Sequence, residues 1–143
     1  MRAIDRATPR LVGLAKRVYE TPEIGFAEWK TARRVATQFA RLGLPAKDGL
    51  AVTGLRADLA LGRGGPTIAV IGELDGLPVP GHPGADAKTG VAHACGHHAQ
   101  LGMLLGVATA LSARGVADGL AGRVAFIAAP AEELVDLGQR LEM

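Results

Sequence analysis

The sequence predicts an α/β fold, and three stretches of the chain carry the prediction. Two short apolar runs, residues 67–74 and 122–129, have the composition and the glycine or proline boundaries of strands. Between them, residues 99–113 are almost wholly apolar, which is too long for a strand and too short to span a membrane, so a buried helix is expected. The order strand, helix, strand predicts parallel pairing with a right-handed crossover.

A first helix is expected near the N-terminus, over residues 9–19. Apolar side chains recur there at helical spacing, and Thr8 and Pro9 stand where a helix cap and a first helical residue are favoured. Thr21 and Pro22 then end the helix. The apolar positions that define its buried face are Leu11, Leu14, Ala15 and Val18.

A second helix and two further features precede the apolar helix. Residues 28–42 place their apolar side chains on one face, and Gly43 follows as a stop signal. Residues 53–59 predict a strand, and the run over 67–74 predicts a buried central strand. Residues 76–90 are rich in glycine, proline and aspartate, which is typical of a long loop that is either functional or mobile.

Composition excludes several classes of protein. With 143 residues, 48% apolar and 21% charged, the chain has the make-up of one ordinary globular domain. The formal net charge is only +2 and the basic residues are scattered, so no nucleic-acid partner is expected. No apolar leader or membrane span is evident, and one cysteine fits a reducing compartment. We therefore expect a cytoplasmic protein without a membrane partner.

All four histidines and the single cysteine lie in one short segment of the chain. They are His82, His93, His97 and His98, with Cys95 among them. In an extended or turn segment, residues two apart point the same way, so His93, Cys95 and His97 can share a face while His98 points off it. Imidazole and thiolate bind zinc and similar ions, and a candidate metal half-site follows. Two alternatives stay open: a small buried cysteine beside polar loop histidines, and a cysteine nucleophile with a histidine base.

Three carboxylates directly follow predicted strands. Glu132 and Glu133 come just after residues 122–129, at the usual place for active-site residues in open α/β sheets. If the chain stays extended they project to opposite sides, so one can hold a cation while the other acts as general base. The alternative is the acidic first turn of a helix. Asp75 ends the strand over 67–74, where it can orient a metal-bound imidazole or simply start a turn.

Four ordered motifs resemble one enzyme family. They are TPEIGFAE at 21–28, GELDGLP at 72–78, HACGHHAQ at 93–100 and PAEE at 130–133. Together they are similar to the co-catalytic metallopeptidases and amidohydrolases that include N-acyl-amino-acid, indole-acetyl-amino-acid, hippurate and aminobenzoyl-glutamate hydrolases. The resemblance spans nearly the whole chain but only the N-terminal part of the family's catalytic domain. It implies a partial three-layer α/β/α, zinc-peptidase-like domain with a mainly parallel or mixed central sheet.

The resemblance also implies a reaction and a set of residue roles. Cys95 and His97 match two metal ligands, Glu133 matches a further ligand, Glu132 the catalytic base and Asp75 a carboxylate behind the ligands. The implied cofactors are two divalent metal ions, zinc or manganese with cobalt as an alternative. The implied reaction is hydrolysis of the amide bond of an N-acyl amino acid or a dipeptide, a small-molecule substrate.

Two positions depart from the family pattern. The common motif has Asp or Asn after Cys-Gly-His, where this chain has His98. In the wider family a ligand histidine stands two residues before the strand-end aspartate, where this chain has Glu73. The roles of His82, His93 and His98 are left open by the sequence.

Ligand counting leads to an expectation about the chain as a whole. Two ions need about five or six protein contacts even with sharing, and the resemblance supplies three here. Relatives add two later histidines and a lid and dimerisation domain, which implies a homodimer for the full-length protein. We therefore expect residues 1–143 to be an N-terminal part that is inactive or slow by itself. The alternative is a non-catalytic metal-binding or interaction module built from the same fold fragment.

Overall fold

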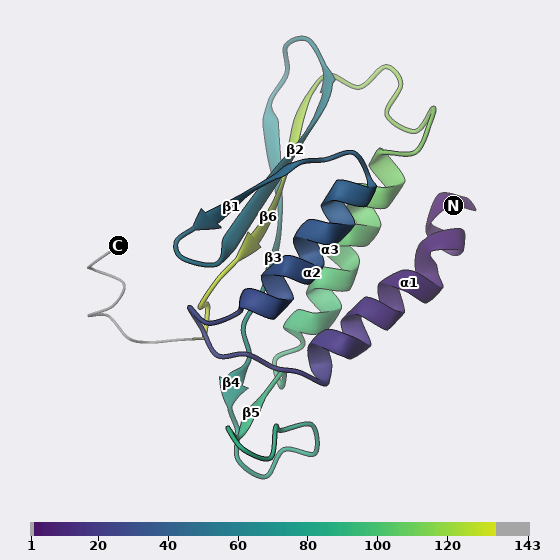
Figure 1. The fold of residues 1–143 in the computed structure, drawn as a ribbon. Coiled ribbons are helices and arrows are strands. Elements are labelled where there is room, and N and C mark those ends of the chain that lie inside the picture. The colour runs from purple at the N-terminus through teal and green to yellow at the C-terminus, as the bar shows by residue number, and fades with distance from the viewer. Residues whose placement is uncertain (1, 134–143) are drawn as a thin grey trace.

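A mixed four-stranded sheet forms the framework of the protein. The computed structural model describes residues 2–133, and Figure 1 shows the course of the chain. The strands lie in the order β1-β2-β6-β3; β2 is antiparallel to β1 and β6, and β3 is parallel to β6. The elements are α1 (Arg2–Tyr19), α2 (Trp29–Arg41), β1 (Ala46–Leu50), β2 (Gly54–Gly62), β3 (Thr67–Glu73), β4 (Leu77–Pro78), β5 (Val91–Ala92), α3 (His97–Leu111) and β6 (Gly122–Ala129).

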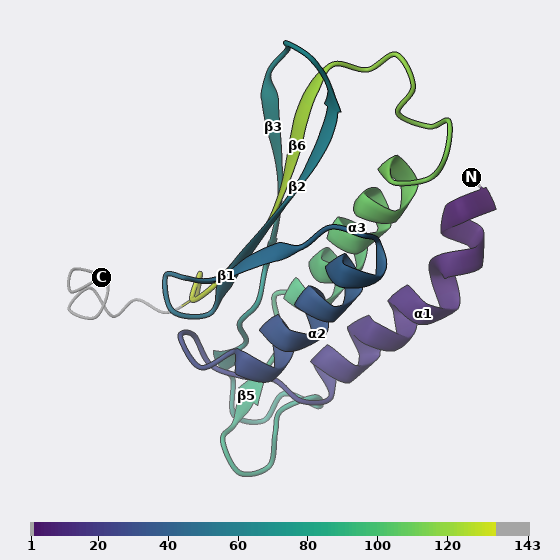
Figure 2. The ribbon, with the colours of Figure 1, turned by 45° about the horizontal axis from the view of Figure 1, so that its top comes forward.

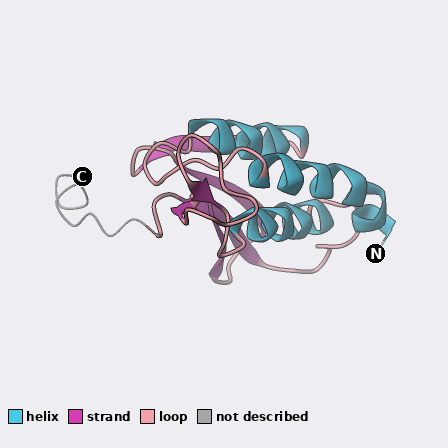
Figure 3. Cartoon of the chain, turned by 90° about the horizontal axis from the view of Figure 1, so that it is seen from below, coloured by secondary structure: helices cyan, strands magenta, loops and turns pink. Residues whose placement is uncertain are grey.

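The helices lie together on one side of the sheet (Figures 1 and 2). Helices α2 and α3 contact the strands, and α1 packs against α3. Figure 3, seen from below, shows the helices grouped beside the strands. The core lies between these layers, where the rings of Phe39 and Phe126 are 6.1 Å apart. Its other fully buried large side chains include Leu14, Leu74, Leu101, Leu104 and Leu105. The mixed sheet and its helices confirm the α/β class.

The unit β3-α3-β6 has the predicted order and parallel pairing. Strand β6 has the predicted bounds, and β3 ends one residue earlier than expected. The prediction that β3 is central and buried is wrong. Among residues 2–133 it is an edge strand, and Ile68 and Ile71 are 60% and 58% exposed. An apolar run predicts burial on both faces, but among residues 2–133 helices cover only one side of this sheet.

The first helix is longer than the sequence predicts. It begins at Arg2, so Pro9 lies inside it rather than at its first position. Thr8 is not a cap, because its hydroxyl donates to the carbonyl of Ile4 one turn earlier. The buried stripe extends back to Ala7, and this packing outweighs the one backbone hydrogen bond that proline removes. The second helix matches its predicted range within one residue at each end.

Residues 76–90 form the expected loop and are tied to the rest of the fold at several points. The short strands β4 and β5 pair antiparallel at its base. The N–H of Gly76 donates to the carbonyl of Glu23 at 2.8 Å, which joins the end of β3 to the segment before α2. The Asp86 carboxylate accepts the N–H groups of Lys88 and Thr89 within the loop. Among residues 2–133, no helix combines the length and apolar character needed to cross a membrane.

Candidate metal centre

Three segments meet at one end of the sheet. Strands β3 and β6 are parallel, so their carboxyl ends lie at the same edge, and the pairing continues where the N–H of Leu74 donates to the carbonyl of Ala129. Helix α3 begins at this edge with His97. Gly96, at φ 92°, turns the chain into that helix in a conformation that favours glycine. The predicted strand-end carboxylates and His97 are thereby brought together.

The imidazole of His97 is almost completely buried and held in one orientation. Its Nδ1 lies 2.8 Å from the carbonyl oxygen of Asp75 and 3.3 Å from the Asp75 carboxylate. A carbonyl oxygen can only accept, so Nδ1 carries the hydrogen. In the neutral imidazole with this tautomer, the lone pair is on Nε2, which is the form that binds a metal.

Three carboxylates surround that lone pair. The distances from His97 Nε2 are 3.0 Å to Glu73, 3.6 Å to Glu133 and 3.8 Å to Glu132. One donor atom each from Glu73, His97 and Glu132 lies within 4.8 Å of the others.

This donor set fits a divalent cation. Tetrahedral ligands at about 2.0–2.2 Å from zinc are themselves about 3.3–3.6 Å apart, close to the spacing around His97 Nε2. Several carboxylates beside a lone pair repel one another and the lone pair, and a positive charge between them removes that repulsion. Oxygen and imidazole ligands suit zinc and manganese alike.

Asp75 lies directly behind this cluster. It is 1% exposed, and its carboxylate accepts the backbone N–H of Glu133 at 2.9 Å. Its other carboxylate oxygen has no hydrogen-bond partner among residues 2–133 and faces His97 Nδ1. Asp75 thus contacts two of the three predicted ligands, which is the position that the sequence predicts for an orienting carboxylate.

Glu132 and Glu133 do not project to opposite sides as an extended chain predicts. Ala131 has a φ of 52°, so the chain turns after β6 and both carboxylates approach the same nitrogen of His97. The side chain of Glu132 is 51% exposed and that of Glu133 is 21% exposed. The alternative of a helix first turn depends on residues from 134 onward, outside the described part of the chain.

Cys95 lies beside Glu133 and is exposed to solvent. A hydrogen bond to the Glu133 carboxylate, then burial and the neighbouring negative charges, raise the pKa of the Cys95 thiol. A bound cation would reverse this effect, because a coordinating thiol loses its proton. Residues 93–96 form a turn, and His93 and His97 are buried while Cys95 is exposed, so the three residues do not lie in one environment.

The other three histidines make different contacts. The ring centroids of His93 and His98 are 5.8 Å apart, and the His98 ring is tilted against that of Tyr19 with centroids 4.9 Å apart. Both nitrogens of His93 lack hydrogen-bond partners among residues 2–133. Burial, followed by the charges of the neighbouring histidines, lowers the pKa of His93 to about 4. His82 accepts the N–H of Gly84 within the 76–90 loop.

Glu73 is the residue of the cluster that the sequence did not select. It ends β3 and points to His97 Nε2 at the shortest distance of the three carboxylates. The observation that could have identified Glu73 as a candidate ligand is its position two residues before Asp75, where the wider family has a ligand histidine.

Comparisons with known proteins find relatives among amide hydrolases and peptidases. IAA-amino acid hydrolase ILR1-like 5 of Arabidopsis thaliana is 35% identical over 86% of this chain and 28% of its own length. N-acetyl-L-cysteine deacetylase of Bacillus subtilis is 32% identical over 87% and 30%. The chain therefore spans less than a third of these relatives. The crystal structure of the Bacillus subtilis YXEP protein, a dinuclear metal binding peptidase from the M20 family, superposes with a TM-score of 0.76 at 30% identity, over 94% of this chain and 38% of that one.

The sequence profile of Peptidase family M20/M25/M40 matches residues 69–141, more than half of the chain. The matched range contains α3, β6 and most of β3, the three elements that form the cluster around His97. With the motifs, the fold and the arrangement at the sheet edge, this match identifies the chain as a member of Peptidase family M20/M25/M40.

Proposed function

We propose that this chain carries part of the active site of a metal-dependent amide hydrolase. The observation that carries the proposal is the imidazole of His97, whose Nδ1 is fixed on Asp75 while Nε2 faces several carboxylates. Family membership supports the same reaction class. The relatives named as a hydrolase of IAA-amino acids and a deacetylase of N-acetyl-L-cysteine support an N-acyl amino acid as the substrate. A dipeptide is the alternative substrate that the motif resemblance implies.

Cys95, His97 and Glu133 are the proposed metal ligands. Glu73 is a fourth candidate, since its carboxylate lies 3.0 Å from His97 Nε2. The family and a dinuclear structural neighbour support two divalent ions, with zinc, manganese or cobalt compatible with this donor set. When bound, such ions acidify a water molecule and polarise the amide carbonyl.

Glu132 is the proposed general base. Its side chain is the most exposed of the three carboxylates near His97, which leaves it accessible to water and substrate. In this role it takes a proton from the attacking water and delivers it to the departing nitrogen. Asp75 keeps Nδ1 of His97 protonated and holds the backbone of Glu133, so both candidate ligands keep their orientation.

Residues 1–143 supply fewer candidate ligands than two metal ions need. Two ions need about five or six protein contacts, and Cys95, His97, Glu133 and Glu73 provide four candidates. We propose that the 143-residue chain alone hydrolyses N-acyl amino acids slowly or not at all, and that the full-length protein is a homodimer. The short count also favours the second candidate function, a non-catalytic metal-binding module. A cytoplasmic location is proposed from the single cysteine, Cys95.

Calorimetric titration with Zn²⁺ and Mn²⁺ tests the metal site. We expect the native chain to bind metal, His97→Ala to lose at least tenfold in affinity, and the matched control His82→Ala to bind as the native chain does. Absence of binding by the native chain would contradict the proposal.

The two candidate functions differ in the effect of Glu132→Gln. This variant is expected to keep its metal while any residual hydrolysis of an N-acetyl amino acid falls by about 10²–10⁴-fold. Because residues 1–143 alone are expected to hydrolyse slowly or not at all, the comparison is made in the full-length protein. Absence of hydrolysis there by both the native protein and Glu132→Gln, with metal bound to both, would favour the non-catalytic module.

A further inference from the structure

A second carboxylate, Glu28, is fully buried away from the metal centre. It directly precedes α2 and is 0% exposed. Thr53 donates its hydroxyl hydrogen to one Glu28 oxygen at 2.5 Å, and the backbone N–H of Ala131 donates to the other at 2.8 Å. Burial raises the pKa of Glu28, and these hydrogen bonds partly oppose the rise. Glu28 thus joins three segments that are distant in the sequence.

The bond to Ala131 acts where the chain leaves β6. Ala131 has a φ of 52°, a left-handed conformation that costs a non-glycine residue about 1–2 kcal/mol. That turn directs Glu132 and Glu133 toward His97 instead of along the strand.

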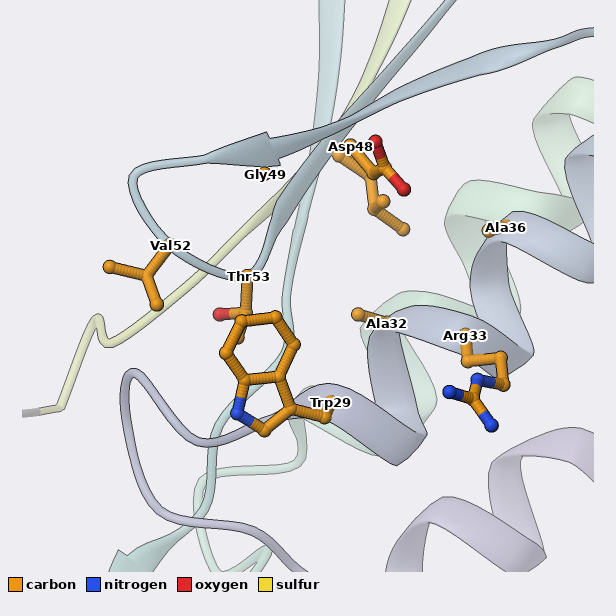
Figure 4. A pocket seen from close by; sticks show the side chains of 9 residues that line it. Trp29, Ala32, Arg33, Ala36, Asp48, Gly49, Val52 and Thr53 are labelled. Atoms are coloured by element: carbon orange, nitrogen blue, oxygen red, sulfur yellow. The ribbon is translucent and has the colours of Figure 1, made fainter.

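The other non-glycine residues of the described chain with positive φ lie close in sequence to Glu28 or to its partner Thr53. Apart from Ala131, the non-glycine residues with positive φ among positions 2–133 are Phe26, Ala51 and Val52. Phe26 comes two residues before Glu28, and Val52 directly precedes Thr53. Trp29, Val52 and Thr53 line one pocket of about 410 Å³, between α2 and the turn from β1 to β2 (Figure 4). Each of the three segments that Glu28 joins therefore contains a non-glycine residue in the left-handed conformation.

A purely structural role does not explain why this buried position holds a carboxylate. Burial of a carboxylate costs several kcal/mol unless it is paired, and among residues 2–133 no basic side chain forms an ion pair with Glu28. An apolar side chain would fill the same space without that cost. What the carboxylate adds is a second acceptor oxygen that reaches Ala131 while the first holds Thr53.

We propose that Glu28 is a positioning residue of the metal centre: by fixing the turn at Ala131 it holds Glu132 and Glu133 against His97. It works with Asp75, which holds the backbone of Glu133 from the opposite end of the same short segment. This inference rests on the proposed function, because it concerns the orientation of the proposed base and ligand. Glu28 itself touches neither of them in the interactions described above.

A matched pair of variants distinguishes the effect of the length of the Glu28 side chain from the effect of its charge. Glu28→Gln keeps the length of the side chain and an oxygen for Ala131 but removes the charge, and Glu28→Asp keeps the charge but shortens the reach. We expect Glu28→Gln to bind Zn²⁺ within about threefold of the native chain and Glu28→Asp to lose about tenfold or more. Thr109→Val serves as the stability control, because the Thr109 hydroxyl is buried and bonded within α3; its Zn²⁺ affinity should stay native.

Amide hydrogen exchange, measured by NMR without metal, gives an independent readout. The N–H groups of Ala131 and Glu133 should lose protection in Glu28→Asp and keep it in Glu28→Gln. Native protection at both amides in Glu28→Asp, or a loss of Zn²⁺ affinity in Glu28→Gln that equals the loss in Glu28→Asp, would overturn the inference. A native chain that binds no Zn²⁺ would contradict the proposed function instead, and the exchange data would still decide whether Glu28 positions this segment.

Discussion

The carboxylate of Asp75 accepts the backbone N–H of Glu133 at 2.9 Å, across 58 positions of sequence. The same residue meets Nδ1 of His97 through its carbonyl oxygen and its second carboxylate oxygen. One buried side chain therefore connects the ends of β3 and β6 with the start of α3, the three elements that build the candidate metal centre.

Asp75→Asn is expected to weaken metal binding by about 10–100-fold. Both carboxylate oxygens face N–H donors, from Glu133 and His97, and an asparagine offers only one oxygen, so its NH₂ group must face a donor. Calorimetric Zn²⁺ titration measures the change. The matched control Asp58→Asn, on the exposed surface of β2, should bind as the native chain does. Equal affinities for all three proteins would contradict an orienting role.

The metal-free chain should lose stability as the pH falls from about 6.5 toward 4. Burial lowers the pKa of His93 to about 4, so in this range the unfolded chain binds a proton that the folded chain does not. The His93 contribution is complete above pH 6.5 and is lost on acidification, by at most about 3 kcal/mol. Urea unfolding across this range measures it. His93→Phe should show a correspondingly smaller pH dependence, and an unchanged dependence would contradict the assignment.

Two glycine substitutions at α3 should act in opposite directions. Gly96 has a φ of 92° and nothing within 4 Å of an added Cβ, so Gly96→Ala is expected to cost about 1–2 kcal/mol through backbone strain alone. Gly102 lies inside the helix, and its added Cβ would make an ordinary 3.7 Å contact with Ala15. Gly102→Ala should therefore stabilise by about 0.5–1 kcal/mol. Urea unfolding of both variants tests this, and the same sign for both would be inconsistent with the structure.

The Cys95 thiol should alkylate faster once the neighbouring carboxylate is neutralised. Glu133 raises the pKa of Cys95, so at pH 8 Glu133→Gln increases the thiolate fraction. The rate with iodoacetamide in the metal-free chain is expected to rise about two- to tenfold. Glu20→Gln, at the exposed residue that directly follows α1, is the control. An alkylation rate that does not change in Glu133→Gln would contradict the effect of the Glu133 carboxylate on the pKa of Cys95.

Local patterns predicted most of the elements but not their surroundings. The apolar runs correctly located β3, α3 and β6, because glycine boundaries and length distinguish a short strand from a helix. The exposure of Ile71 could not be predicted in this way, since it depends on which layers cover the sheet. Strand β1 was missed because its sequence, AKDGL, has no apolar alternation.

At the site, the sequence predicted which residue types take part, but it did not predict where their side chains point. Alternation in an extended chain predicted that Glu132 and Glu133 diverge, and the positive φ of Ala131 makes them converge. Alanine rarely adopts the left-handed conformation, so an alanine at position 131 does not predict a turn there. Likewise the role of Glu28 depends on a hydrogen bond to Ala131 across 103 positions, which no local pattern contains.

The central claim, that Cys95, His97 and Glu133 share a cation, is tested most directly by the absorption spectrum of the Co²⁺-loaded chain. The account predicts a near-ultraviolet band from thiolate-to-cobalt charge transfer, which Cys95→Ser abolishes while His97→Ala and Glu133→Gln each weaken Co²⁺ binding at least tenfold. A Co²⁺ complex without that band, or one that forms equally well in His97→Ala, would contradict the account.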